Sequence, residues 1–182
     1  GIRDLVRSPG LGDVYKRQPQ FGQVKSGANY AMALGPTLAA KAEHGVDQVL
    51  FAPGGKVTET GAANLILLDG DRVVTPELDG SLLPGVTRDS ILQLARDSGR
   101  KVEEKHMDMD EVVAWAEAGG EAALSGTAAV LAPVGTLLWA DGSAVTFNRG
   151  EVGDNVLELR DALTALHRGE AEDTHGWLEV IE

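Results

Sequence analysis

The sequence predicts a mixed α/β domain, and three observations lead to this fold class. From residue 21 onward, short apolar runs typical of strands alternate with segments in which apolar residues recur at helical spacing. Glycine, proline and Asp-Gly pairs stand between these segments, where turns are needed. At 182 residues the chain is long enough for one substantial core and short for two. We therefore expect one main α/β domain.

Each expected helix has a recognisable start or end. Gly45 ends the first helix, Pro84 opens the second, and Asp108 or Asp110 caps the third. The last helix is closed near Gly169. The expected helices cover residues 31–44, 84–97, 108 or 110 to 116, and 155–166.

The expected strands are short, and two of them form a hairpin. Asp69-Gly70-Asp71 is a turn signal between two apolar runs, so these runs are predicted to pair. Strands are expected at residues 48–52, 56–59, 64–68, 72–75, 101–107, 121–124, 130–134 and 136–139.

Charge and composition argue against several classes of protein. Acidic residues outnumber basic ones 28 to 16, and the formal charge of -12 argues against sequence-independent binding to nucleic acid or anionic lipid. No apolar run approaches the roughly 18 residues of a membrane span, so we expect no membrane partner. The lack of cysteine excludes disulfides and thiolate metal sites and fits a cytoplasmic protein. No metal site is predicted, because metal-ligand spacing is missing among His44, His106, His167 and His175.

The first residues of the chain differ from the rest. Residues 1–18 mix charges with glycine and proline and show no amphipathic period, and residues 11–18 resemble translated adapter or junction sequence. We predict that residues 1–18 are non-native or disordered and that residues 19–182 form the functional domain.

The segment Lys25-Ser26-Gly27-Ala28-Asn29-Tyr30 places an amine near a phenol. A lysine amine forms an imine with a carbonyl only when it is neutral, and burial lowers its pKa toward that state. We expect Lys25 to leave a strand end, Tyr30 to share a hydrogen bond with a ligand oxygen, and Asn29 to hold the turn. Taken alone, such a lysine is more often a solvated surface group, and such a tyrosine a half-buried aromatic residue.

Glu59 ends an expected strand, and small residues follow it as far as Asn64. Thr60-Gly61-Ala62-Ala63 would let a planar ligand approach, and a carboxylate beside a pyridine nitrogen keeps that nitrogen protonated. The plainer interpretation is a solvated glutamate at the end of a strand.

Two turns are suited to an anion. Leu83-Pro84-Gly85-Val86-Thr87-Arg88 places a glycine turn at a helix N-terminus, where free amides and the helix dipole favour negative charge. Ser125-Gly126-Thr127-Ala128 follows a short strand and offers a second turn rich in donors. Helix starts of this kind also occur for capping alone. An amine, a phenol, a carboxylate and two such turns together are the groups that a pyridoxal-phosphate site needs.

In this order and at these separations, the motifs resemble the fold-type IV pyridoxal-phosphate enzymes, and most closely the branched-chain amino-acid aminotransferases. The resemblance extends from about Phe21 to the C-terminus. It implies the large cofactor-binding domain of the D-amino-acid aminotransferase-like fold, with the smaller N-terminal domain missing. The segments that carry it are Lys25 to Tyr30, Asp47 to Leu50, Glu59 to Asn64, Leu83 to Asp89, Ser125 to Ala129 and Arg168 to Asp173.

The resemblance implies a role for each chemical group. Lys25 is the Schiff-base lysine that moves a proton between the substrate Cα and the cofactor. Tyr30 bonds the ring O3′, and Glu59 pairs with the pyridinium nitrogen. The other implied cofactor-binding positions are Asn64, Leu83, Gly85, Val86, Thr87, Gly126 and Thr127.

Within this set the resemblance separates the ring, the phosphate and the substrate. Leu83 packs on the ring face. The amides of Val86 and Thr87, together with Thr127, hold the phosphate, while the backbone of Thr127 and Ala128 receives the substrate carboxylate. The implied reaction is a two-stage transfer of an amino group from leucine, isoleucine or valine to 2-oxoglutarate, with pyridoxal 5′-phosphate as cofactor. The implied assembly is a homodimer or a higher homo-oligomer in the cytoplasm.

Two departures from the family pattern are visible. Gly27 is followed by Ala28 where the family usually has a second glycine, and the extra methyl group is tolerable if the local φ is negative. The family's smaller upstream domain, with an arginine that clamps the phosphate, has no counterpart here. We therefore expect weak cofactor binding and little turnover, because a missing charge-assisted contact to the phosphate costs about 1.5–3 kcal/mol.

Other interpretations stay open at this point. A D-amino-acid aminotransferase or an aminodeoxychorismate lyase shares the lysine, the glutamate and the phosphate turns. The closing segment Arg168 to Trp177 resembles the branched-chain group more than these two. A non-catalytic fragment or an oligomerisation domain of the same shape is the alternative from a different class.

Overall fold

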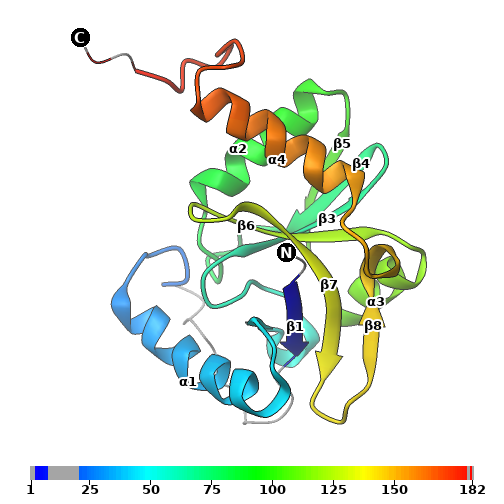
Figure 1. Cartoon of the computed structure of the whole chain (residues 1–182). Coiled ribbons are helices and arrows are strands. Elements are labelled where there is room, and N and C mark those ends of the chain that lie inside the picture. The colour runs from blue at the N-terminus through cyan, green and yellow to red at the C-terminus, as the bar shows by residue number, and fades with distance from the viewer. Residues whose placement is uncertain (1–2, 8–20, 180, 182) are drawn as a thin grey trace.

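The computed structural model describes residues 3–7, 21–179 and 181. The described strands form one mixed sheet in the order β2-β1-β7-β6-β3-β4-β5, and β8 pairs with β7 (Figure 1). The strands are β1 (Arg3–Arg7), β2 (Gln48–Leu50), β3 (Asn64–Asp69), β4 (Arg72–Pro76), β5 (Lys101–Lys105), β6 (Glu121–Gly126), β7 (Val130–Trp139) and β8 (Ala144–Thr146). The helices are α1 (Gly27–His44), α2 (Val86–Asp97), α3 (Met109–Glu117) and α4 (Asp154–His167), with short 3₁₀ helices at Pro53–Gly55 and Phe147–Gly150. The predicted mixed α/β class is confirmed.

The predicted hairpin is confirmed as well. β3 and β4 are antiparallel, Asp69 lies opposite Arg72, and Gly70 turns the chain with a φ of 52° in the left-handed region. β3 also pairs with β6, and β6 with β7, in antiparallel fashion. β1 lies parallel to both β2 and β7, and β4 lies parallel to β5. The sheet therefore mixes both kinds of pairing.

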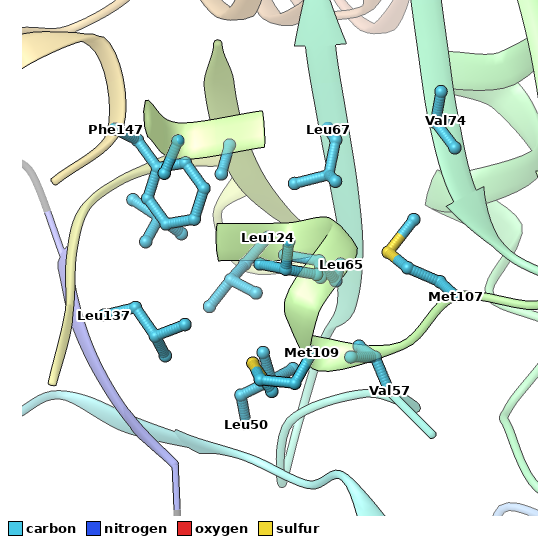
Figure 2. Close-up of a cluster of buried hydrophobic side chains, with 14 residues drawn as sticks. Leu50, Val57, Leu65, Leu67, Val74, Met107, Met109, Leu124, Leu137 and Phe147 are labelled. Atoms are coloured by element: carbon cyan, nitrogen blue, oxygen red, sulfur yellow. The ribbon is translucent and has the colours of Figure 1, made fainter. Parts of the chain in front are cut away.

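Strand β3 is buried on both faces, and its alternate side chains enter two separate cores. Leu65 and Leu67 point to the face that α3 covers (Figure 2). Ile66 and Leu68 point to the opposite face, under α2 and α4. A strand with two buried faces is apolar at successive positions, which explains the uninterrupted apolar run at residues 65–68.

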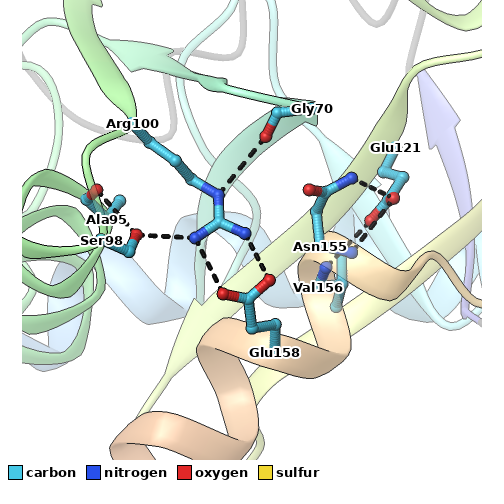
Figure 3. Close-up of polar contacts among 8 residues, drawn as sticks. All are labelled: Gly70, Ala95, Ser98, Arg100, Glu121, Asn155, Val156 and Glu158. Atoms are coloured by element: carbon cyan, nitrogen blue, oxygen red, sulfur yellow. Dashed lines mark hydrogen bonds and ion pairs between the residues drawn. The ribbon is translucent and has the colours of Figure 1, made fainter.

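Strand β6 fixes the start of α4 through a buried carboxylate. Glu121 Oε1 accepts hydrogen bonds from Asn155 N at 3.2 Å and Asn155 Nδ2 at 2.6 Å, and Oε2 accepts one from Val156 N at 2.9 Å (Figure 3). The free amides at a helix N-terminus favour such an acceptor. Arg100, which follows α2, pairs with Glu158 of α4 at 2.6 Å. The two helices are thus held together over one face of the sheet.

Helix α1 lies beside the β2 edge of the sheet and shares little of the main core (Figure 1). A small cluster of Ala33, Val49 and Phe51 joins it to β2 and the residue that follows. Asn29 and Ala33 are the buried residues of α1. Exposed large apolar side chains on α1 and in the loop before it are Phe21, Val24, Met32, Leu34 and Leu38.

Helix boundaries differ from the prediction at the start of α1. The helix begins at Gly27 instead of residue 31. The reason is a local cap, because the Ser26 hydroxyl accepts a hydrogen bond from Ala28 N at 3.3 Å. Lys25 therefore stands immediately before the cap of a helix.

Two details of α2 and α3 are also settled by the structure. Helix α2 begins at Val86 and not at Pro84, because Gly85 is its N-cap residue. Val86 is 83% exposed and lines the cavity described below. Asp108 is the cap of α3, since its side chain accepts a hydrogen bond from Glu111 N at 2.9 Å. Asp110 instead lies within the first turn.

The strands differ from the prediction at β5, β7 and β8. Residues 130–139 form one strand where two were expected, and Gly135 does not interrupt it. β5 ends at Lys105, where its pairing with Pro76 of β4 ends, although Glu77 N still donates to Lys105 O at 2.9 Å. Residues 56–59 form isolated bridges, from Lys56 to Asp108 and from Glu59 to Asn64, instead of a strand. β8 was not predicted.

The N-terminal residues also enter the sheet. Residues 3–7 form β1 between β2 and β7, although residues 1–18 were left out of the fold prediction. Residues 8–18 lie outside the described part of the chain. The prediction that residues 1–18 are non-native stays a prediction.

Candidate functional site

One cavity collects every residue that the sequence analysis assigned to the site. It has a volume of about 310 Å³ and lies between the start of α1, segment 59–64, the start of α2 and the turn after β6. The predicted residues that line it are Lys25, Tyr30, Glu59, Asn64, Leu83, Gly85, Val86, Thr87, Gly126, Thr127 and Ala128. Segments that are far apart in the sequence thus meet at one place.

Glu59 is held in the wall of this cavity by a fixed network. It is 2% exposed, so the alternative of a solvated glutamate is wrong. Its Oε2 accepts a hydrogen bond from Asn64 Nδ2 at 2.8 Å, and its Oε1 accepts one from Leu83 N at 3.2 Å. Asn64 Nδ2 also donates to Leu83 O at 3.0 Å. These bonds orient the carboxylate before any ligand arrives.

The turn after Glu59 is closed by the side chain of Thr60. Its hydroxyl accepts hydrogen bonds from Ala62 N at 3.3 Å and Ala63 N at 3.0 Å, and donates to Ala63 O at 3.1 Å. This local bonding fixes the backbone of the turn. Both alanines line the cavity, so small side chains leave space beside the carboxylate.

Helix α2 begins at the cavity without a side-chain cap. Gly85 is its N-cap residue, and no side-chain hydrogen bond caps it. The first amides of a helix have no partner within the helix, so those of Val86 and Thr87 suit an anionic ligand. A Cβ atom on Gly85 would lie 2.4 Å from Asn64 Oδ1. Only glycine fits beside Asn64 here.

Arg88 also lines the cavity, and the sequence analysis assigned it no role. It is 3% exposed, and its Nη2 donates to Pro76 O at 3.0 Å and to Glu104 Oε2 at 2.8 Å. Burial raises the pKa of Glu104, but the hydrogen bonds and charges of its arginine partners outweigh burial and keep that pKa below its usual value. Arg88 thereby fastens the first turn of α2 to the sheet. The signal in the sequence that could have singled out Arg88 is its positive charge in the first turn of a helix, where the helix dipole disfavours a cation.

The turn after β6 supplies another part of the wall. Ser125 lies opposite Asn64 in the β3–β6 register, so the two side chains share one face of the sheet. Ser125 also lines the cavity, although the sequence analysis gave it no individual role beyond its place in the donor-rich turn. β6 ends at Gly126, and β7 begins at Val130 with a φ of 56°.

Lys25 lies in a loop before α1 and not at the predicted strand end. Residues 21–24 form a turn in which Val24 N donates to Phe21 O at 3.1 Å. Asn29 Nδ2 donates to Phe21 O at 3.1 Å and to Val24 O at 2.8 Å, so the prediction that Asn29 holds the turn is confirmed. Lys25 itself is exposed, because this loop lies outside the two cores.

Tyr30 and Ala28 belong to the first turn of α1. Tyr30 is half-buried and lies in the first turn of α1. Ala28 is helical and has no positive φ, so its extra methyl group is tolerated as predicted. A Cβ atom on Gly22 would lie 2.3 Å from Ser81 C, which shows how closely the loop before Lys25 packs on the backbone near Leu83.

An ion pair joins two loops beside the cavity. Lys56 Nζ lies 2.7 Å from Asp79 Oδ2. Burial opposes ionisation of Asp79, but hydrogen bonds from Lys56 and Ser81 outweigh it and lower the pKa of Asp79 to about 2. The same hydrogen bond raises the pKa of Lys56. The pair ties the loop before Leu83 to the segment that leads to Glu59.

Two negative findings concern the described part of the chain. Within residues 3–7, 21–179 and 181, no three His, Cys, Asp or Glu residues are grouped so that they hold a metal ion. In the same residues, no helix has both the length and the apolar character needed to cross a membrane.

A known family accounts for the motifs around this cavity. The sequence profile described as amino-transferase class IV matches residues 13–137, which is more than half of the 182 residues. The chain therefore belongs to the amino-transferase class IV family.

Curated relatives at 40–46% identity are named branched-chain-amino-acid aminotransferases. It is 46% identical over 166 residues to the branched-chain-amino-acid aminotransferase of Mycolicibacterium smegmatis, covering 86% of this chain and 45% of that protein. It is 43% identical to the enzyme of the same name from Mycobacterium tuberculosis, again with 86% and 45% coverage. A probable branched-chain-amino-acid aminotransferase of Staphylococcus aureus is 40% identical over 88% of this chain and 46% of that protein. The chain spans about half the length of the curated relatives that it matches.

Solved structures confirm the predicted fold type. The branched-chain amino acid aminotransferase from Escherichia coli gives a TM-score of 0.77 at 28% identity, covering 97% of this chain and 56% of that one. The enzyme of the same name from Thermobaculum terrenum, in its PLP-bound holo-form, gives 0.74 at 25% identity, with 94% and 52% coverage. Both are similar to this chain over nearly its whole length and over about half of their own.

Proposed function

We propose that the chain is the cofactor-binding part of a pyridoxal-phosphate-dependent aminotransferase that exchanges amino groups between leucine, isoleucine or valine and 2-oxoglutarate. The observation that carries this proposal is the single cavity in which all the predicted site residues meet. The names of the relatives support the substrate class. They do not favour a D-amino-acid aminotransferase or an aminodeoxychorismate lyase.

The residues of the cavity fit this cofactor. An oriented, buried carboxylate at Glu59 suits a ring nitrogen that carries a proton. The uncapped start of α2 offers backbone donors to a phosphate, and a Cβ atom at Gly85 would close the space beside Asn64. Ala62 and Ala63 keep the region between these groups open. The volume of about 310 Å³ is at the lower end for a small-molecule site.

Each group of this chain then has a task in the reaction. When bound, pyridoxal phosphate supplies the carbonyl that accepts the amino group and the ring that withdraws electrons. Lys25 Nζ takes the proton from the substrate Cα and holds it for return. Glu59 keeps a proton on the ring nitrogen, and Tyr30 shares a hydrogen bond with the ring hydroxyl. The backbone of Thr127 and Ala128 orients the substrate by its carboxylate.

We further propose that the whole protein is a cytoplasmic homodimer or higher homo-oligomer. The exposed apolar side chains on α1 and in the loop before it support a partner at this surface. The formal charge of -12 supports the absence of nucleic acid and anionic lipid from its partners. Sedimentation of the whole protein tests the assembly, and a monomer at all concentrations would contradict it.

Covalent trapping tests the proposed function in this chain. We expect borohydride treatment in the presence of pyridoxal phosphate to attach the cofactor to Lys25, as read by peptide mapping. Lys25→Ala should abolish this label, whereas Lys41→Ala, which changes an exposed lysine near the end of α1, should keep it. A label at another lysine, or none in a folded sample, would support a non-catalytic domain.

Substrate assays test the reaction in the whole protein. We expect 2-oxoglutarate-dependent turnover with L-leucine, L-isoleucine and L-valine, and loss of turnover in the Lys25→Ala variant. Turnover with D-alanine or aminodeoxychorismate alone would replace the proposed substrate class by one of the two alternatives.

A further inference from the structure

The cavity contains a buried hydroxyl without a partner. Ser125 is 2% exposed, and Ser125 Oγ is the buried side-chain polar atom that lacks a hydrogen-bond partner within the described part of the chain. An unpaired buried hydroxyl is unfavourable, because the hydration that it loses on folding is not replaced. Native proteins satisfy most such groups, so an exception in a cavity calls for a ligand.

The position of Ser125 in the sheet places this residue near the start of α2. Ser125 lies opposite Asn64, on the face whose next residues, Ala123 and Ile66, pack under α2 and α4. Asn64 in turn lies against Gly85, the N-cap residue of α2. Ser125 and the first turn of α2 line the same cavity.

The groups at this end of the cavity are hydrogen-bond donors, and they need an acceptor with several lone pairs. The amides of Val86 and Thr87 can only donate, and a serine hydroxyl donates one hydrogen bond. The helix dipole adds partial positive charge at the same place. A phosphate group provides both the negative charge and the oxygen acceptors that these donors need. By contrast, Glu59 and Asn64 already bond to each other and to Leu83.

We propose that Ser125 Oγ donates a hydrogen bond to the ligand phosphate and is a further member of the anion site. This inference rests on the proposed function in so far as the phosphate is that of pyridoxal phosphate. The roles taken from the family resemblance assign the phosphate to Val86, Thr87 and Thr127, so the Ser125 hydroxyl extends that set.

The test compares affinity and stability in the Ser125→Ala variant. We expect the Kd values for pyridoxal phosphate and for inorganic phosphate to rise together by about tenfold, since the hydrogen bond that is lost ends on a charged group. The urea midpoint of the ligand-free protein should stay equal or rise, because the variant removes no hydrogen bond within the described residues. Isothermal titration and urea unfolding measure these quantities.

Thr75→Val provides a matched control. Thr75 is 0% exposed, but its hydroxyl donates to Leu65 O at 2.7 Å, and it does not line the cavity. We expect this variant to lower the urea midpoint and to leave both Kd values within twofold. Ser125→Ala should therefore change the two Kd values without lowering the urea midpoint, whereas Thr75→Val should lower the urea midpoint without changing the Kd values.

The possible results separate this inference from the proposed function. A Kd change below twofold for both ligands in the Ser125→Ala variant overturns the inference. A change for pyridoxal phosphate without one for inorganic phosphate also overturns it, because the hydroxyl then contacts another part of the cofactor. If the unmodified chain binds inorganic phosphate but not pyridoxal phosphate, the proposed function fails, and a tenfold loss of phosphate affinity still supports the inference. If it binds neither, both fail.

Discussion

The two sides of the cavity are anchored in different ways. The side with the anion-binding turns belongs to α2 and β6, whose apolar residues fill the two main cores. The side with Lys25 belongs to a loop and to α1, which buries two of its residues and joins the sheet through a small cluster. The proposed anion donors are thus fixed by the core of the domain, whereas a few local hydrogen bonds hold the loop that carries Lys25.

This difference agrees with the tasks that we propose for the two sides. Donors that are fixed in advance bind an anion without having to reorganise. An amine that takes up and returns a proton needs some freedom, and ligand-binding loops are generally drawn from the less stable parts of a protein. The following predictions test whether the two sides differ in stability and respond separately to substitution.

Hydrogen exchange should reveal the largest difference between the two sides. We expect the amides of α1 to exchange through openings that cost at least about 3 kcal/mol less than those of β3, because α1 is attached to so little of the core. Native-state exchange followed by mass spectrometry or NMR measures both elements in one sample. Equal protection of α1 and β3 would contradict the comparison.

Replacing Arg88 should weaken the core-anchored side. Arg88→Met removes a buried guanidinium from Pro76 O and Glu104, and we expect a loss of about 2–3 kcal/mol in the free energy of unfolding. Phosphate affinity should fall as well, because the first turn of α2 loses its attachment. Urea unfolding and phosphate titration measure the two effects.

Arg96→Met is the matched control for this substitution. Arg96 pairs with the same Glu104 at 3.0 Å, but its side chain is 41% exposed. Exposed pairs contribute little, so we expect a loss of less than about 1 kcal/mol and unchanged phosphate binding. Similar losses from the two variants would show that Arg88 has no special place in the site.

Replacing Asn29 should disturb the lysine side alone. Asn29→Ala removes two hydrogen bonds to the turn before Lys25, so we expect this turn to lose about 1 kcal/mol of local stability. The rate of cofactor attachment to Lys25 should fall several-fold, while the Kd for inorganic phosphate stays unchanged. Borohydride trapping over time and phosphate titration provide the two measurements. A parallel loss of phosphate affinity would mean that the two sides are not independent.

Acid should weaken the ion pair between Lys56 and Asp79. We expect this change to have the smallest effect on the free energy of unfolding. The pKa of Asp79 is lowered from 3.8 to about 2 by folding, so its ionised form favours the folded state. That contribution is present above about pH 4 and is lost as the pH falls toward 2. We expect Asp79→Asn to remove less than about 1 kcal/mol at pH 6, and a smaller amount near pH 3. Urea midpoints at both pH values check this, and an equal difference at both would contradict it.

The sequence predicted the list of site residues better than their surroundings. Glu59 and the turn residues Gly85 and Thr127 were recognised because a carboxylate and glycine-containing turns have distinct chemistry. Arg88 and Ser125 were passed over, since the burial of one and the missing partner of the other depend on strands that are distant in sequence. The strand end expected for Lys25 was wrong for the same reason, because the loop before α1 is shaped by its packing on distant residues.

The sequence alone determined the alternation of helices and strands, the β3–β4 hairpin and the motifs of the site. These features depend on local periodicity, turn residues and the chemistry of single side chains, which neighbouring residues specify. Only the tertiary structure decided that Asn64 would join Glu59 to Leu83, that Ser125 would lie opposite Asn64, and that α1 would remain at the edge. Such contacts depend on strand register and helix packing, which are decided by the burial of the whole domain.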